Sequence, residues 1–339
     1  MQSLSEKNDL AAVVWAPEEV RTELFARRLG AKLHHVHVLK YKQPFYAPFK
    51  YPIQWMQTWQ LLYRDRPKFI YVTNPPVFAA LCVYVFCLMT GSKFVMDTHP
   101  PSLYSHKWGW SLPLQWWLSK RTAMNVTDQE RFRHMFEGWG AKCLVLEKPP
   151  KDAPFEKLTK TPDSGKFDIA VVNTFAEDEP LQPILDAARA LPDVQFHITG
   201  NLAKASAEQK VQINNAPSNC RFTGYLLGDQ YWSLLYNARA VMVLTTFPFS
   251  LLGGAQDGMV LNKPVILSDQ PTLREYFSKG AVFVENTTDG IIAGIKDTQT
   301  REQQLIGETA VLLDEKQTQW ETNFRQLLAV MGKSDSNSK

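Results

Sequence analysis

Short apolar segments alternate with longer segments of helical periodicity along the first half of the chain. The apolar segments read AAVVWA, LHHVHVL, FIYVTN, KFVMDTH, AMNVTDQ and KCLVLEK. Strand-length runs separated by helix-length segments are typical of βα units, which build parallel sheets. Residues 1–150 are therefore predicted to form one Rossmann-like, doubly wound α/β domain.

Both periodicities disappear in the proline-rich, charged segment KPPKDAPFEKLTKTPDSGK. We place a linker at residues 151–166. The alternation resumes with FDIAVVNT, VQFHITG, CRFTGY, AVMVLTT, PVILSD and AVFVEN, which predict a second Rossmann-like domain at residues 167–310. An amphipathic helical segment at 311–333 and a disordered tail at 334–339 are expected to complete the chain.

Ligand binding in such domains is expected at the carboxyl ends of the strands. Two doubly wound parallel-sheet domains facing a central cleft would direct those strand ends into the cleft. Neither half has a Gly-x-Gly-x-x-Gly after its first strand, and the chain has no Walker A sequence. These absences argue against a dinucleotide oxidoreductase and a P-loop enzyme.

Composition favours a protein that stays in the cytoplasm. The 339 residues are 45% hydrophobic and 21% charged, and the net charge of +3 is too small to indicate nucleic-acid binding. The four cysteines lack metal-ligand spacing, and the polar N-terminus lacks the apolar core of a signal peptide. The most apolar segment, Val77 to Met89, is shorter than the roughly 20 residues of a membrane-spanning helix, so we expect it to be a buried helix.

The second half also carries an ordered set of motifs. Residues 222–277 contain a strand ending in FTGY, a helix with YWSLLY, the glycine-opened segment LGGAQDGM, then PVILSD and LREYF. In this order they resemble the donor half of family 4 GT-B glycosyltransferases. YVTNPPVFAALCVYVFCLMTGSKFVMDTHPPSLYS and NTFAEDEPLQPILDAARAL are similar to segments of chitobiosyldiphosphodolichol β-mannosyltransferases.

The similar stretches span most of residues 69–285. The resemblance implies a GT-B fold and transfer of a hexose from a nucleoside diphosphate sugar, with a GDP-sugar favoured and a UDP-sugar as the alternative. It leaves open whether the transfer inverts or retains the sugar configuration. No cofactor is implied, and no metal site is expected because no Asp-x-Asp occurs at the cleft positions.

The chain departs from the family at its pair of acidic residues. Family 4 members carry two glutamates eight positions apart, the second lying seven residues before the proline of Pro-Val-Ile. The corresponding positions here are Phe249 and Asp257. One acid is missing and the other is shortened, so a retaining mechanism that depends on the first glutamate is placed in doubt.

The opening of the predicted helix at LGGAQDG is the main donor-site candidate. Gly253, Gly254 and Ala255 can present backbone N–H groups and the positive end of the helix dipole to a diphosphate. Asp257 is expected to accept hydrogen bonds from the ribose hydroxyls. The alternative is a glycine turn followed by an acid that caps the helix.

The resemblance places other strand-end residues along the nucleotide. The first turn of the second domain contains no Arg or Lys, so Lys204 or the helix opening would have to meet the phosphate charge. The remaining predicted donor-binding residues are Asn173, Thr174, Thr199, Gly200, Thr223, Gly224, Tyr225, Ser250 and Leu252.

On the acceptor side, VMDTHPPS places Asp97 and His99 at a strand end. An inverting transfer needs a general base within hydrogen-bond reach of the acceptor hydroxyl, and a carboxylate or an imidazole can serve. These two residues are therefore the catalytic candidates. A local hydrogen-bonded turn is the alternative.

Residues 41–68 and 104–121 interleave Trp, Tyr and Phe with Lys and Arg. This composition suits contact with the inner face of a membrane, although aromatic core residues between solvated charges would give the same pattern. Similar enzymes often use lipid-linked sugar acceptors, so we expect a lipid-linked glycan in envelope or exopolysaccharide synthesis. The rival hypotheses are a nucleotide-sugar epimerase and a non-catalytic accessory subunit whose donor site has decayed at Phe249.

Overall fold

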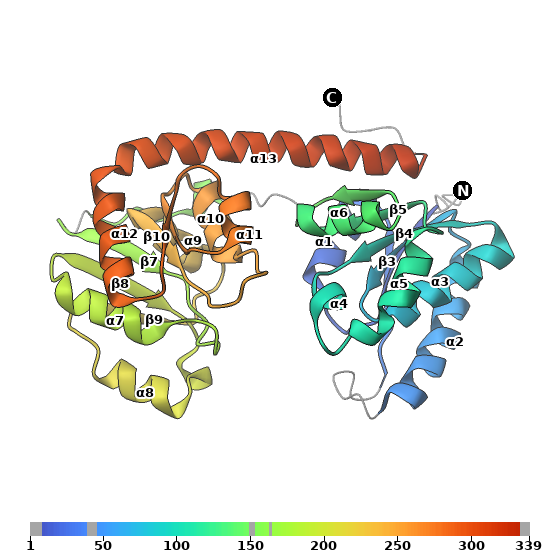
Figure 1. Ribbon diagram of the computed structural model, residues 1–339, viewed down its shortest axis with the longest axis horizontal. Helices are drawn as coiled ribbons and strands as arrows, with labels where there is room; N and C mark the ends of the chain where they lie inside the picture. Colours follow the sequence, from blue (N-terminus) through green and yellow to red (C-terminus); the bar gives the residue numbers. More distant parts are fainter. Residues whose placement is uncertain (1–8, 39–45, 149–152, 163–164, 333–339) are drawn as a thin grey trace, which may run out of the picture. The chain divides into compact units, whose positions relative to one another are not determined.

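The computed structural model describes residues 9–38, 46–148, 153–162 and 165–332. The chain divides into two compact units. Unit 1 comprises Met1–Pro150 with Gln319–Lys339, and unit 2 comprises Lys151–Thr318. Each unit contains one six-stranded parallel sheet flanked by helices (Figure 1).

The sheet of unit 1 has the order β2-β1-β3-β4-β5-β6, in which the first crossover reverses the direction of strand progression. Its strands are β1 (Leu10–Val14), β2 (Lys32–His35), β3 (Phe69–Asn74), β4 (Lys93–Thr98), β5 (Met124–Thr127) and β6 (Cys143–Val145). Its helices are α1 (Val20–Leu29), α2 (Ala47–Asp65), α3 (Val77–Thr90), α4 (Pro101–Tyr104), α5 (Leu112–Ser119) and α6 (Glu130–Gly138), with the 3-10 turn η2 (Gly109–Ser111).

Alternate residues of the unit 1 strands pack against helices on opposite faces of the sheet. Val13, Val72 and Met96 lie in one apolar cluster with α3, while Ala12 and Val95 lie in another cluster with α1. The apolar segment from Val77 to Met89 falls within α3, whose inner side is buried, as predicted. No helix of the described residues is both long and apolar enough to cross a membrane.

The sheet of unit 2 has the order β12-β11-β10-β7-β8-β9. Its strands are β7 (Phe167–Val171), β8 (Val194–Thr199), β9 (Cys220–Gly224), β10 (Ala240–Val243), β11 (Val265–Ser268) and β12 (Ala281–Val284). Its helices are α7 (Leu181–Ala190), α8 (Ala207–Asn214), α9 (Gly228–Asn237), α10 (Gly253–Val260), α11 (Pro271–Tyr276) and α12 (Thr288–Thr300), with the 3-10 turns η3 (Phe155–Lys157) and η4 (Leu202–Lys204).

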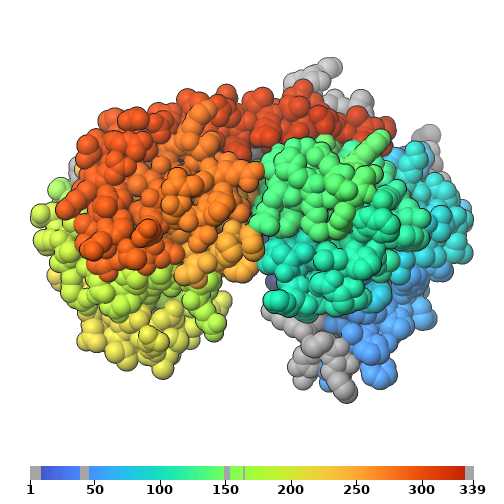
Figure 2. All heavy atoms as spheres, viewed as in Figure 1, coloured from blue at the N-terminus to red at the C-terminus, as the bar shows by residue number. Residues whose placement is uncertain are grey.

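Two apolar clusters sandwich this second sheet. One face packs against α7 and α12, and the other packs against α9, α10 and α11. The short helix α8 (yellow) lies at the opposite end of unit 2 from the first turns of α13 (Glu302–Val330) (Figure 1, Figure 2).

The C-terminal helix differs from the prediction. A helical segment was expected from residue 311, but α13 begins at Glu302. Its later apolar residues, including Trp320 and Leu327, pack in the core of unit 1 with Phe25. The apolar period of 3.6 residues predicts the helix. It does not predict which core each part of the helix packs against, because those contacts join residues far apart in sequence. The predicted disordered tail at 334–339 lies outside the described residues.

Candidate functional site

The carboxyl end of β4 carries the first candidate group. Asp97 is the fifth residue of this strand and pairs in register with Thr73 of β3 and Val126 of β5. Its side chain is fully buried, with an exposed fraction of 0%. The neighbouring strands β3 and β5 thus enclose this carboxylate near the carboxyl end of a central strand.

Arg21 of α1 holds Asp97 in a two-point ion pair. Its Nε lies 2.9 Å from Asp97 Oδ2, and its Nη2 lies 3.0 Å from Oδ1. The same Nη2 also donates to the carbonyl of Leu146. Burial by itself would raise the pKa of Asp97, but the charges of Arg21 and His99 outweigh this effect and hold the pKa well below its ordinary value.

These contacts distinguish the two catalytic candidates, Asp97 and His99. A buried carboxylate with a depressed pKa and an arginine partner is a poor proton acceptor. His99 Nε2 lies 3.3 Å from Asp97 Oδ2, so Asp97 can accept the Nε2 hydrogen and leave Nδ1 as the basic nitrogen. This geometry suits Asp97 to positioning His99 rather than to accepting a proton itself.

The backbone fixes the loop that carries His99. The N–H of His99 donates to the carbonyl of Asn74 at 2.8 Å, and its carbonyl accepts from the N–H and the hydroxyl of Ser102. His99 also lines an open pocket of about 1260 Å³ in unit 1, here called the aromatic pocket. His99 thus lines a space large enough for a substrate.

A chain of rings lines the aromatic pocket. The ring centroids of Trp15 and Tyr51 lie 5.9 Å apart, those of Tyr51 and Phe78 5.0 Å, and those of Phe78 and Trp110 5.7 Å. Lys50 and Lys107 contribute positive charge to the same lining. Burial, and then the charge of Lys107, lowers the pKa of Lys50, which places two cations in one electrostatic environment.

Asp128, directly after β5, belongs to the same charged neighbourhood but was not predicted. Its Oδ1 is buried with no hydrogen-bond partner among the described residues. Burial raises the pKa of Asp128, whereas Arg21 and His99 act in the opposite direction. Its position at a strand end in NVTDQ was the signal that could have identified it. Arg21 was also missed, because an arginine in an amphipathic helix ordinarily faces solvent.

In unit 2, five predicted donor residues come together at the carboxyl ends of β7, β8 and β9. They line an open pocket of about 350 Å³, here called the donor pocket, together with Lys204, Tyr231 and Trp232. Lys204 is the one Lys or Arg in this lining as far as the described residues show. The five predicted residues are Asn173, Thr174, Thr199, Gly200 and Tyr225.

Hydrogen bonds hold the first two strand ends of the donor pocket together. The N–H of Asn173 donates to Thr199 Oγ1 at 3.1 Å, and Glu179 accepts from the N–H and the hydroxyl of Thr174. Gly200 has φ 128°, and a Cβ there would lie 2.8 Å from the carbonyl oxygen of Asn173. Only glycine fits this close approach of two turns.

The rest of the predicted donor set is not part of the donor pocket. Gly224 forms the turn after β9 with φ 75°, and Thr223 faces a different pocket that is described below. Ser250 and Leu252 lie in the loop before α10, which begins at Gly253. The N–H of Ala255 donates to the carbonyl of Leu252. The N–H of Ala255 is thus already used within the opening of the helix, whereas Gly253 and Gly254 occupy the first helical positions, where N–H groups have no intrahelical partner.

Asp257 is buried, with an exposed fraction of 4%, and accepts a hydrogen bond of 3.0 Å from the Tyr231 hydroxyl. Burial, and then the Asp257 charge, raises the pKa of Tyr231 well above its ordinary value. Tyr231 lines the donor pocket and Asp257 does not, so Asp257 contacts that space through Tyr231. At the position of the missing acid, Phe249 packs edge-on against Phe247.

The sequence matches no protein-family model and no curated protein. Solved structures are nevertheless similar over nearly the whole chain. HepE from Anabaena, crystallised with UDP-glucose, has a TM-score of 0.68 at 12% identity, with 94% of this chain and 99% of HepE covered. Sucrose-phosphate synthase from Thermosynechococcus elongatus has a TM-score of 0.69 at 11% identity, with coverage of 94% and 99%.

A putative UDP-N-acetylglucosamine 2-epimerase from Listeria monocytogenes is also similar, with a TM-score of 0.67 at 10% identity and coverage of 96% and 97%. At sequence identities this low, the structural similarity establishes the fold alone. The protein has the GT-B fold, in which two Rossmann-like domains each contain a doubly wound parallel sheet.

Proposed function

We propose that this protein is a glycosyltransferase that moves a hexose from a nucleoside diphosphate sugar to an acceptor hydroxyl. The observation that carries the proposal is the Arg21–Asp97–His99 chain at the carboxyl end of β4, with His99 lining a pocket of about 1260 Å³. A separate pocket of about 350 Å³ at strand ends of unit 2 suits a nucleotide. A transferase needs a site for the acceptor and a site for the donor, and the two pockets offer one each.

The proposed reaction is an inverting displacement. The acceptor hydroxyl oxygen attacks the anomeric carbon, its proton passes to His99 Nδ1, and the bond from the anomeric carbon to the diphosphate breaks. Asp97 stabilises the protonated imidazole and keeps Nε2 as the donor, since Arg21 keeps the carboxylate ionised. The N–H groups of Gly253 and Gly254 would stabilise the departing diphosphate.

For the donor we propose a UDP-sugar, with a GDP-sugar as the alternative that the family resemblance implies. HepE was crystallised with UDP-glucose. The donor pocket, at about 350 Å³, lies within the range of small-molecule sites. Tyr225 and Trp232 in its lining offer rings for a base.

For the acceptor we propose a lipid-linked glycan of envelope or exopolysaccharide synthesis. The rings of the aromatic pocket suit an apolar chain and carry this part of the proposal, since the two lysines of the lining, Lys50 and Lys107, stand beside two acids, Glu18 and Glu19. On α2, Phe49, Ile53 and Met56 recur at helical spacing with exposed fractions of 63%, 42% and 72%. This exposed stripe supports peripheral contact with the inner face of a membrane.

The test combines calorimetry with a transfer assay. Titration with UDP and GDP should show binding of UDP, and incubation with a panel of UDP-hexoses and a prenyl-diphosphate sugar should release UDP. His99→Gln should keep the UDP affinity but lower kcat by roughly 100-fold or more, as expected for loss of a general base. Absence of binding to any nucleotide would favour the accessory-subunit hypothesis, while a changed sugar configuration in the donor without an acceptor would favour the epimerase.

Membrane contact is tested separately by co-sedimentation with liposomes. We expect binding to vesicles that contain anionic lipid, and we expect the Phe49→Ser/Met56→Ser variant to lose it. Leu88→Ser replaces an exposed apolar residue of α3 and serves as the control. If neither neutral nor anionic vesicles bind the protein, the membrane proposal is wrong.

A further inference from the structure

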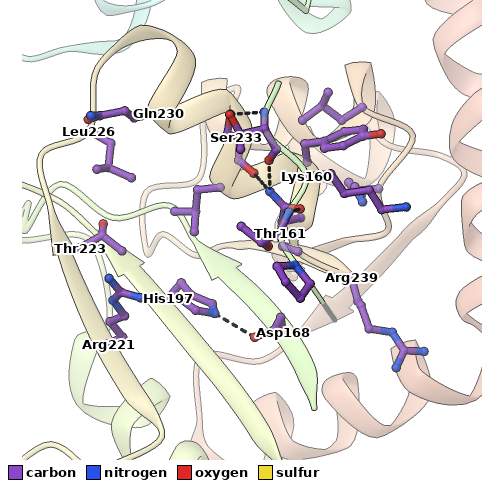
Figure 3. A pocket seen from close by; sticks show the side chains of 18 of the residues that line it. Lys160, Thr161, Asp168, His197, Arg221, Thr223, Leu226, Gln230, Ser233 and Arg239 are labelled. Atoms are coloured by element: carbon purple, nitrogen blue, oxygen red, sulfur yellow. Dashed lines mark hydrogen bonds and ion pairs between the residues drawn. The ribbon is translucent and has the colours of Figure 1, made fainter. Parts of the chain in front are cut away.

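A second pocket of unit 2 has no part in the proposed transfer. It is an open pocket of about 1020 Å³, here called the linker pocket, and it shares only Leu226 with the donor pocket. Its charged lining consists of Lys160, Asp168, His197, Arg221, Arg239, Lys263 and Glu302, of which Figure 3 labels the first five. Three of them lie on β7, β8 and β9, and the others lie on the segment before β7, in the turns before β10 and β11 and at the beginning of α13.

Strand alternation explains why this pocket is polar. Ile169, Phe196 and Phe222 pack in the apolar cluster under α7 and α12, so their neighbours Asp168, His197 and Arg221 point to the opposite face. There, α9 packs on Ala170 and Val241. His197 and Arg221 are paired in register on β8 and β9, toward the edge of the sheet, and both face the linker pocket (Figure 3).

Hydrogen bonds fix the segment that forms one wall of the linker pocket. The N–H of Thr159 donates to Ser233 Oγ at 3.1 Å, and the N–H of Thr161 donates to Asn237 Oδ1 at 2.8 Å. Asn237 in turn donates to the carbonyl of Thr159 at 2.7 Å. The wall is therefore held along α9 by side chains of that helix, in a defined position.

Each of the two acids of the lining already has a side-chain partner. Asp168 Oδ1 lies 2.9 Å from His197 Nε2, and Glu302 Oε1 accepts from Arg239 Nε at 2.9 Å. By contrast, Lys160, Arg221 and Lys263 form no ion pair with any residue that the structure describes. The lining thus carries an excess of positive charge.

Lys263 is the most informative of these cations. Burial lowers its pKa, and only the charge of Glu302 opposes that shift. Its ammonium lies 5.5 Å from the centre of the Tyr236 ring, so the group is partly withdrawn from water beside an aromatic face. An anion in the linker pocket would add counter-charge to that of Glu302 beside this lysine.

We propose that the linker pocket binds a phosphorylated small molecule at a site separate from the donor pocket. Arg221 on β9 and Lys263 before β11 are separated by β10, β7 and β8, so they would donate hydrogen bonds to phosphate groups at opposite ends of the ligand. The side chains of Thr223, Gln230 and Asn262, which also line the pocket, would bind hydroxyl groups of the same ligand. The volume of about 1020 Å³ is sufficient for a molecule of that size.

The test is a calorimetric titration of the full-length protein with inorganic pyrophosphate in the presence of saturating UDP, which fills the donor pocket. Pyrophosphate should still bind. The Arg221→Ala/Lys263→Met variant should bind it about tenfold more weakly or worse, with UDP affinity unchanged. Lys210→Ala on α8, outside the linker pocket, should bind pyrophosphate like the wild type.

Arg221→Ala alone provides a milder variant, because this side chain is exposed and its loss should not alter thermal unfolding. It should weaken pyrophosphate binding measurably. Absence of pyrophosphate binding, loss of binding when UDP is added, or equal binding by wild type and the double variant would each overturn the proposal. A protein that binds pyrophosphate but neither UDP nor GDP would contradict the proposed transferase and leave the second binding site standing.

Discussion

Tyr231 donates a hydrogen bond of 3.0 Å from its hydroxyl to Asp257 Oδ2, which joins α9 to α10 beside the donor pocket. This contact changes how the surviving acid of the family pair is understood. Because Asp257 is buried and bonded to the Tyr231 hydroxyl, we propose that its effect on a bound nucleotide passes through that tyrosine.

The first prediction concerns nucleotide affinity. Asp257→Ala should weaken UDP binding by about 10-fold to 100-fold, since it removes a hydrogen bond to a charged group and leaves the Tyr231 hydroxyl without it. Tyr231→Phe should produce part of this loss. Phe249→Ala is the control, because it alters only the position of the missing acid. Calorimetry that gave the larger loss for Phe249→Ala would show that the site has been assigned in the wrong register.

The second prediction concerns the stability of unit 1. Arg21→Met should lower the free energy of unfolding by about 3–5 kcal/mol, because it leaves the Asp97 carboxylate buried without its ion pair. The Arg21→Met/Asp97→Leu variant should recover much of this loss in denaturant unfolding. Arg28→Met changes a neighbouring arginine of α1 that stacks on Trp320 and should have a smaller effect. Equal destabilisation by both single variants would contradict the importance of the buried pair.

The third prediction follows from the depressed pKa of Asp97. A carboxyl group whose pKa is lower in the folded state stabilises the protein above its unfolded pKa, and the stabilisation is lost as pH falls below that value. The difference in unfolding free energy between wild type and Asp97→Asn should therefore be largest above about pH 5 and shrink as the pH falls further. Urea unfolding at a series of pH values measures this difference. If the difference stayed constant over that range, Arg21 would not be lowering the pKa of Asp97 in the folded protein.

The fourth prediction separates the two glycines that open α10. A Cβ at Gly254 would lie 2.6 Å from Val172 Cγ1, whereas a Cβ at Gly253 would meet nothing within 4 Å. Gly254→Ala should cost about 1–3 kcal/mol through overpacking, and Gly253→Ala should leave stability nearly unchanged. Adding Val172→Ala to Gly254→Ala should relieve only part of the clash, because Val172 Cβ would still lie 2.8 Å from the new Cβ. Thermal unfolding of the three variants decides whether Gly254 is needed for the approach of α10 to the end of β7.

Much of the fold was predictable from the sequence for a simple reason. A strand buried on both faces needs a short run of apolar residues, so AAVVWA, FIYVTN and PVILSD could be located without any contact information. The segment from Val77 to Met89 was likewise expected to be a buried helix. The start of α13 at Glu302 was missed because polar residues fill its first turns, and helix boundaries carry weaker signals than helix interiors.

The candidate sites were predictable only in part. Strand-end residues such as Asn173, Thr199 and Gly200 were correctly brought to one pocket, because parallel strands expose their carboxyl ends at the same edge. The N–H of Ala255, which the sequence offered to a phosphate, is used by the helix itself. Arg21 and Tyr231 were missed because their partners lie 76 and 26 residues away along the chain.

The sequence by itself determined which residues form strands and helices, that there are two parallel sheets, and that polar side chains follow several strands. These properties depend on local periodicity and on the direction of each strand. Only the tertiary structure decided which of those side chains act together. It buried Asp97 against Arg21, left His99 facing the aromatic pocket, and joined Asp257 to Tyr231. The charge and pKa of a group depend on neighbours that come from distant segments, and those neighbours are set by packing alone.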